Sequence, residues 1–333
     1  MLAPRLVGYY GACRVARFQV RTFVVSGGVS ERYKHLYKNL RLDSVPDLPV
    51  QETVPLVWQQ YKPSKGFEID NSLPPVLMLH GLFGSKQNYG SVGRKITQLT
   101  GHPIYGVDLR NHGQSPHSNP HNYYTLAKDV IRFIDERGWK EIVLVGHSMG
   151  AVTSMLVSLL KPGLISKLIV IDNSPVTKEL SPNFTYDLVG MCQVEHQASE
   201  WNNKPPAFRA KKIDTILGLY EKDEKVRFFL KTNVIKSKAT EHPIFRVPVL
   251  NFLKDGVLNN LGAWPADKVE GRKFDKPVLV MGAKHSKFVL PEYLPEFKKY
   301  FSNLSYQEFD CGHWIVTDMP EEFVKSSINF INS

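Results

Sequence analysis

The pentapeptide Gly146-His147-Ser148-Met149-Gly150 constrains the fold of this chain more than any other feature. It follows an apolar run at residues 142–145 and precedes residues 152–160, where apolar side chains recur at helical spacing. G-x-S-x-G requires a strand, a sharp turn and a helix, because the turn strains the serine backbone and the glycines let strand and helix approach closely. The pattern therefore predicts a nucleophile, Ser148, held at the N-terminus of a helix.

Short apolar runs separated by longer amphipathic segments extend over most of the chain. After a first strand-like segment at residues 54–61, the runs lie at 76–79, 104–107, 142–145, 168–171 and 278–281. Continuous apolar strands joined by helical segments are typical of a mostly parallel sheet that is covered by helices on both faces. We therefore predict an α/β domain over residues 54–333.

The alternation of strands and helices stops after residue 171 and resumes near residue 278. The intervening segment is rich in charge, aromatic residues and proline, and we expect an inserted helical cap over about residues 176–274. Residues 215–220 and 225–233 look helical within it. Their apolar side chains, such as Val226, Phe229 and Leu230, could face a pocket or could pack onto the core.

The first 30 residues contain four arginines and no acidic residue, and the arginines interrupt the apolar residues. This composition predicts a mitochondrial transit peptide at residues 1–30, and hence a mitochondrial location, rather than a secretory signal. A disordered basic tail is the alternative. Residues 31–53 are charged and rich in turn residues, and we expect them to form a linker.

The formal net charge of +10 does not indicate nucleic-acid binding. Without the four N-terminal arginines the balance is 38 basic to 32 acidic residues, and no Lys/Arg cluster is interleaved with stacking aromatics. No apolar run approaches 18 residues, so we expect no transmembrane segment. The three cysteines are scattered, and Cys311 with His313 and His285 would lack a fourth zinc ligand, so we expect neither a metal nor a bound cofactor.

A serine hydroxyl is a weak nucleophile and needs a base within hydrogen-bond reach. The best base is His313, in Asp310-Cys311-Gly312-His313-Trp314, which lies after the expected last strand at about 305–309 and before the closing helix from Pro320. We expect Cys311 to serve only in packing.

The base must in turn be oriented by a carboxylate. The loop after residues 278–281 is the usual place, but here it reads Gly282-Ala283-Lys284-His285-Ser286-Lys287 and contains none. Asp172 ends the preceding parallel strand beside the elbow, at the sheet edge where sites of open α/β folds gather. The predicted triad is therefore Ser148, Asp172 and His313.

An acyl-transfer site also needs two hydrogen-bond donors for the oxyanion. The first is the N–H of Met149, directly after the nucleophile. The second is expected in the loop after residues 76–79, which reads His80-Gly81-Leu82-Phe83-Gly84, with Leu82 as the donor. We expect His80 to order this loop rather than to act as a second base.

Taken together, these motifs resemble the α/β-hydrolase family that contains the mitochondrial abhydrolase-eleven proteins and the yeast ethanol acetyltransferases. The resemblance covers residues 76–330. It implies the α/β-hydrolase fold and an acid after the strand that follows the elbow, which is Asp172 here. The matching segments are residues 80–86, 108–117, 146–150, 172–176 and 312–314.

The same resemblance implies an acyltransferase in which Ser148 takes an acetyl group from acetyl-CoA, as co-substrate, and passes it to ethanol. Esterase and thioesterase side activities are expected, and the partners are small molecules: acyl-CoA, short alcohols and esters. A mitochondrial serine hydrolase that acts on esters or thioesters without transferase activity is the close alternative. A non-catalytic binding protein is a minor one.

Overall fold

The computed structural model describes residues 31–201, 203–235 and 244–333. The predicted transit peptide, residues 1–30, lies outside the described residues. Among the helices described, none is both long and apolar enough to span a bilayer.

A seven-stranded sheet forms the centre of the molecule, with the strand order β1-β3-β2-β4-β5-β6-β7. β1 is antiparallel to β3, and all the other neighbours are parallel. The strands are β1 (Trp58–Gln60), β2 (Val76–Leu79), β3 (Ile104–Val107), β4 (Ile142–His147), β5 (Ile165–Ile171), β6 (Val278–Ala283) and β7 (Leu304–Phe309). The predicted α/β fold is confirmed, and every predicted apolar run is a strand.

The first strand is shorter than the predicted residues 54–61, and on its N-terminal side two backbone N–H groups bond to side chains. The N–H of Val54 donates to Asp129 Oδ1 at 2.8 Å, and the N–H of Val57 donates to Ser115 Oγ at 2.9 Å. Trp58–Gln60 pair with β3, and the N–H of Tyr61 adds one more bond, to the Ile104 carbonyl of β3 at 2.9 Å.

Helices cover both faces of the sheet, which explains why its strands are apolar without alternation. Val76 and Met78 of β2 pack in the cluster that includes α1 (Gly90–Thr100) and α11 (Pro320–Asn332). Leu77 and Leu79 pack in the cluster of the opposite face, which includes α2 (Tyr123–Glu136) and α3 (Met149–Leu160). The short helices α9 (Leu294–Lys298) and α10 (Ile315–Asp318) flank β7 along the chain.

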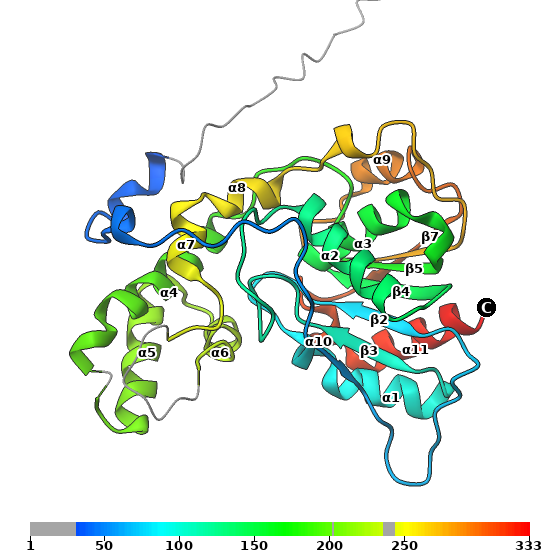
Figure 1. Cartoon of the computed structure of the whole chain (residues 1–333), viewed down its shortest axis with the longest axis horizontal. Coiled ribbons are helices and arrows are strands. Elements are labelled where there is room, and N and C mark those ends of the chain that lie inside the picture. Colours follow the sequence, from blue (N-terminus) through cyan, green and yellow to red (C-terminus); the bar gives the residue numbers. More distant parts are fainter. Residues whose placement is uncertain (1–30, 202, 236–243) are drawn as a thin grey trace, which may run out of the picture.

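The cap is inserted between β5 and β6. Its helices are α4 (Pro182–Trp201), α5 (Pro206–Tyr220), α6 (Glu224–Lys231), α7 (Val249–Lys254) and α8 (Val257–Gly262). Figure 1 shows α4, α5 and α6 as a separate group at one side of the sheet, joined to it through α7 and α8.

Residues 31–53, which we expected to be a linker, contain two short 3₁₀ helices, Glu31–Leu36 and Leu42–Ser44. Asn251 Nδ2 and Lys254 Nζ of α7 donate to the carbonyls of Pro46 and Val45, both at 2.7 Å. These bonds hold the segment against the cap, and in Figure 1 the blue segment runs beside α7.

Candidate active site

The elbow places Ser148 between the end of β4 and the start of α3. Ser148 has φ 55° and ψ −115°, a left-handed conformation that is costly for a residue with a side chain. The N–H of Ser148 donates to the Ile171 carbonyl of β5 at 3.0 Å, which holds the turn in place. A Cβ at Gly146 would overlap the Gly150 carbonyl, and one at Gly150 would overlap the Leu79 carbonyl. The close approach of β4, α3 and β2 therefore depends on both glycines.

Asp172 and His313 lie together, as the sequence predicted. Asp172 follows β5, and its Oδ2 accepts a hydrogen bond from His313 Nδ1 at 2.6 Å. Its other oxygen, Oδ1, accepts from the N–H of Ala283 at 3.1 Å. The carboxylate has no solvent exposure, whereas the His313 side chain is 15% exposed. Because Nδ1 is engaged by the carboxylate, Nε2 is the imidazole nitrogen that can take up and release a proton.

Two residues that sequence reasoning did not single out hold the His313 loop. His147, the second residue of the elbow, shares a hydrogen bond of 2.8 Å between its Nε2 and the His313 carbonyl. Burial lowers the pKa of His147 to about 3, so the ring is neutral and its Nε2–H donates. The ring of Phe288 stacks on that of His313 with centroids 4.3 Å apart. The position of His147 next to the nucleophile is the only sequence signal that could have suggested this role.

The loop that contains Leu82 passes directly over the nucleophile, since a Cβ at Gly81 would lie 3.1 Å from Ser148 Cβ. The Gly81 carbonyl accepts from His80 Nδ1 at 2.8 Å and from the N–H of Gly84 at 3.0 Å. In a trans peptide the Leu82 N–H points opposite to that carbonyl. Within the described part of the chain this N–H has no hydrogen-bond partner, so it is available to an oxyanion.

His80 is neutral and orders the loop, as predicted. Its Nε2 accepts from the N–H of Leu109 at 3.0 Å, so the proton sits on Nδ1 and is donated to the Gly81 carbonyl. Burial lowers the pKa of His80, which keeps the ring uncharged.

The other predicted donor, the N–H of Met149, is the first N–H group of α3. The first N–H groups of a helix have no intrahelical partner and carry partial positive charge. Ser148 therefore has one candidate oxyanion donor beside it in the chain and another in the loop above it.

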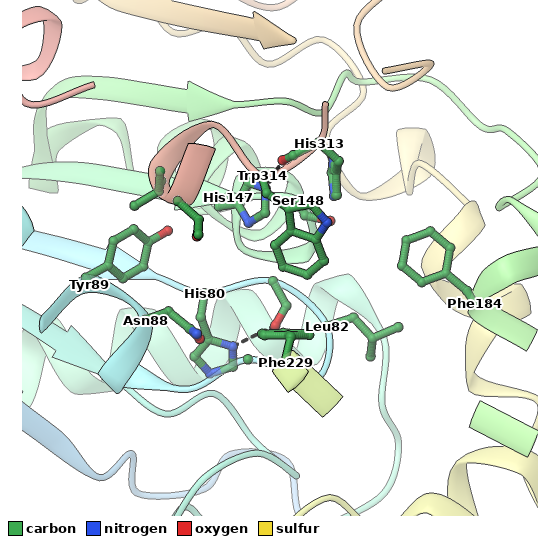
Figure 2. A pocket seen from close by; sticks show the side chains of 14 residues that line it. His80, Leu82, Asn88, Tyr89, His147, Ser148, Phe184, Phe229, His313 and Trp314 are labelled. Atoms are coloured by element: carbon green, nitrogen blue, oxygen red, sulfur yellow. Dashed lines mark hydrogen bonds between the residues drawn. The ribbon is translucent and has the colours of Figure 1, made fainter. Parts of the chain in front are cut away.

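A small pocket of about 60 Å³ opens beside the nucleophile. Figure 2 shows His147, Ser148 and His313 on one side of it, and His80 and Leu82 on the other. Phe229 of α6 also lines it, whereas Leu230 is buried in the core. The cap helix α6 therefore both lines the pocket and packs onto the core, which are the two roles considered for its apolar side chains.

A wider cleft of about 590 Å³ adjoins the small pocket, and the two share Phe184, His313 and Trp314. Lys178 on its wall donates to Ser174 Oγ at 2.8 Å and to the Phe288 carbonyl at 2.9 Å. Burial lowers the pKa of Lys178 to about 7, so its charge depends on pH in the neutral range.

Cys311 does not compete with Ser148, because burial raises the pKa of its thiol to about 11 and keeps it protonated. The His285 ring contacts Asp310 at 2.8 Å, and it is the His285 backbone N–H that donates to the Cys311 carbonyl, at 3.1 Å. Within residues 31–201, 203–235 and 244–333, no group of three or more His, Cys, Asp or Glu side chains is suited to a metal ion.

Comparison with known proteins gives matches over most of the chain. A family model described as the alpha/beta hydrolase fold matches residues 74–320. Ethanol acetyltransferase 1 of Wickerhamomyces ciferrii is 31% identical over 319 residues, covering 90% of this chain and 79% of that protein. An abhydrolase domain-containing protein of Schizosaccharomyces pombe is 34% identical over 261 residues, covering 78% of this chain and 93% of that protein. A solved structure described as a marine microorganism esterase superposes with a TM-score of 0.71 at 22% identity, over 83% of this chain and 99% of that chain.

Proposed function

Because the chain belongs to the α/β-hydrolase family that includes the ethanol acetyltransferases, we propose that it is a serine-dependent acyltransferase. The proposed reaction transfers the acetyl group of acetyl-CoA to ethanol and yields an acetate ester, with esterase and thioesterase side activities. The observation that carries the proposal is the 2.6 Å contact between His313 Nδ1 and the buried Asp172 Oδ2, together with the pocket that His313 and Ser148 both line.

In the first half of the proposed reaction, Ser148 Oγ attacks the thioester carbonyl while His313 Nε2 takes the hydroxyl proton. Asp172 accepts the Nδ1–H and stabilises the imidazolium that forms. The N–H groups of Leu82 and Met149 donate to the oxyanion of the tetrahedral intermediate. When the intermediate collapses, the C–S bond breaks, His313 returns the proton to the departing thiol, and the acetyl group stays on Ser148.

The second half repeats the same steps with an alcohol as the nucleophile. His313 takes the proton of the alcohol as its oxygen attacks the acetylated serine, and then returns that proton to Ser148 Oγ. Water in place of the alcohol gives acetate, so transfer and hydrolysis share one intermediate and differ only in the acceptor.

The sizes of the two cavities support a short acyl group on a large carrier. The small pocket of about 60 Å³ has several times the roughly 10–15 Å³ that one water needs, which is room for a group of a few heavy atoms. The adjoining cleft of about 590 Å³ has room for a bulky thiol carrier, and its lining contains both cations, Lys178 and Lys287, and acids, Glu179, Asp187 and Glu221.

Purified protein incubated with acetyl-CoA and ethanol tests the proposal when ethyl acetate and acetate are both measured. We expect ethyl acetate from the wild type and none from Ser148→Ala. The matched control is Ser326→Ala on α11, outside the lining of the pocket, which should behave as the wild type does. Acetate without any ester would refute the transferase and leave the serine hydrolase.

A fluorophosphonate probe distinguishes a serine enzyme, whether acyltransferase or hydrolase, from a non-catalytic binding protein. The probe should label the wild type and Ser326→Ala but not Ser148→Ala. Absence of labelling in the wild type would favour the binding protein.

We further propose a mitochondrial location, which rests on the four arginines and the absence of acidic residues in residues 1–30. A fluorescent protein fused behind these residues should enter mitochondria, and the chain lacking them should not. Cytosolic fluorescence of the full-length fusion would contradict the proposal.

A further inference from the structure

The turn that carries Leu82 contains a strained residue. Phe83 has φ 60° and is almost fully buried, at 2% exposure. A residue with a side chain in this left-handed conformation costs about 1–2 kcal/mol, so the turn persists only where its surroundings hold it. If Phe83 relaxed, the Leu82–Phe83 peptide would rotate and Leu82 would move with it.

Two buried side chains hold the backbone of Phe83, one at its N–H and one at its carbonyl. The N–H of Phe83 donates to His112 Nε2 at 3.1 Å, from the loop after β3. The carbonyl of Phe83 accepts from Asn233 Nδ2 at 2.7 Å, and Asn233 belongs to the cap, directly after α6. Both partners are buried, with Asn233 3% and His112 0% exposed.

Asn233 has little freedom to turn away from this bond, because its backbone is also held. Its backbone N–H donates to the Leu230 carbonyl at 3.1 Å, and its backbone carbonyl accepts from the N–H of Arg246 at 2.9 Å. Its side-chain nitrogen faces two acceptors, the carbonyls of Phe83 and Leu230, so the NH₂ group must be the one that points there.

The helix that precedes Asn233 also contacts the other side of the pocket. Phe229 of α6 packs edge-on against Trp314, with ring centroids 4.5 Å apart, and Trp314 follows His313. Figure 2 shows Phe229 with Leu82 at the edge of the pocket that faces His313. One end of α6 thus lies against the histidine loop while Asn233 holds the loop above the nucleophile.

We infer that Asn233 is a positioning residue that holds Leu82 in the geometry needed to bind the oxyanion. The cap then takes part in the reaction, because it supplies the hydrogen bond that keeps the oxyanion loop in its strained conformation. The inference rests on the proposed function of Ser148 and Leu82 and goes beyond it, since no residue of the cap is required by the triad itself.

Two variants test the inference. Asn233→Asp keeps the shape of the side chain but cannot donate to the Phe83 carbonyl, and Asn233→Ala removes the bond without adding charge. The matched control is Asn251→Ala on α7, since Asn251 is also a buried asparagine that donates to a backbone carbonyl at 2.7 Å, away from the pocket.

The readouts are kcat and KM for p-nitrophenyl acetate, the inhibition constant of a trifluoromethyl ketone that forms a tetrahedral oxyanion on serine, and the melting temperature. We expect both Asn233 variants to lose about 10- to 100-fold in kcat with little change in KM. This loss should not exceed the loss caused by removing a whole oxyanion donor. Ketone binding should weaken by the same factor. Asn251→Ala should lower the melting temperature without either effect.

A folded Asn233 variant with unchanged kcat and ketone affinity would overturn the inference. An equal loss of kcat in Asn251→Ala would also overturn it, because general loosening of the cap would then explain both. If neither Asn233 variant folds, the bond serves stability and the inference fails. A wild type that neither cleaves the ester nor binds the ketone would instead refute the proposed function, and the inference with it.

Discussion

Asp172 has a fully buried carboxylate on a backbone that adopts the left-handed conformation, with φ 46°. The sharp bend at the end of β5 aims the side chain at the loop after β7 and not along the strand. Its two oxygens then have separate tasks, because Oδ1 is held by the N–H of Ala283 while Oδ2 meets His313. A residue that is anchored by one oxygen can orient a base with the other.

For this single residue we predict that Asp172→Asn lowers kcat by about 10⁴-fold, because an amide nitrogen facing Nδ1 forces the wrong imidazole tautomer. The fold should survive, since Asn retains the oxygen that accepts from Ala283. The matched control is Asp310→Asn, an exposed carboxyl that contacts His285 and Lys284. Steady-state hydrolysis of p-nitrophenyl acetate measures both variants, and near-normal activity of Asp172→Asn would move the acid elsewhere.

The sequence predicted the residues that the site brings together but not the residues that hold them. Asp172 could be found because the 282–287 loop contains no carboxylate and because Asp172 ends a parallel strand. His147, Phe288 and Asn233 could not be found in this way. The hydrogen bonds of His147 and Asn233 join positions more than a hundred residues apart, and Phe288 meets His313 from a different loop, so no local spacing encodes these pairs.

At the scale of elements, the elbow works because β4 and α3 meet at glycine contacts. We predict that Gly150→Ala lowers the free energy of unfolding by about 2–4 kcal/mol, because the added Cβ would push α3 away from the Leu79 carbonyl. Labelling of Ser148 by a fluorophosphonate should also be weaker in Gly150→Ala than in the wild type.

Gly163→Ala is the matched control for this prediction, since a Cβ there would meet no atom within 4 Å. It should change the free energy of unfolding by less than about 0.5 kcal/mol. Denaturant midpoints compare the two variants. Equal stability of Gly150→Ala and the wild type would show that strand and helix can separate at no cost.

The elements of the sheet were predictable and those of the cap only in part. Strands buried on both faces leave continuous apolar runs. In the cap, the predicted segment 225–233 covers α6 except for its first residue, whereas 215–220 recovers only the C-terminal part of α5. α4 is buried over much of its length and around its axis, with polar residues such as Asp187 and Gln193 among the buried ones. A helix packed in this way has no clear apolar stripe to indicate it.

Across the whole molecule, the cleft between cap and core contains a carboxyl pair that the proposed reaction does not use. Asp187 of α4 is 7% exposed, lines the cleft together with Glu221, and has a buried Oδ1 without a donor among the described residues. Burial, together with the nearby Glu221, raises the pKa of Asp187 to about 8. The folded protein therefore holds a proton here that the unfolded chain releases near pH 4.

Because the pKa of Asp187 is higher in the folded state, this residue costs stability as pH rises from about 4 to about 8. Asp187→Asn is neutral throughout, so we predict that it raises the free energy of unfolding by about 1–3 kcal/mol at pH 8 and changes it little at pH 4. Urea unfolding at both pH values measures the difference.

Asp214 gives a control of opposite sign. The hydrogen bond from Lys231 lowers the pKa of Asp214, so Asp214→Asn should lose stability at neutral pH, and the loss should fade as pH falls below 4 through the lowered pKa of the folded state. A stabilisation by Asp187→Asn that is the same at every pH would contradict the account of the buried carboxyl.

The central claim, that Ser148 carries the acyl group, is tested most directly by trapping that group. The protein is mixed with acetyl-CoA in the absence of ethanol, quenched with acid on the millisecond scale, digested, and analysed by mass spectrometry. The account predicts an acetyl group on the peptide that contains Ser148, which addition of ethanol before the quench removes as ethyl acetate. An acetyl group on another residue, or ester formed while Ser148 is never acetylated, would contradict it.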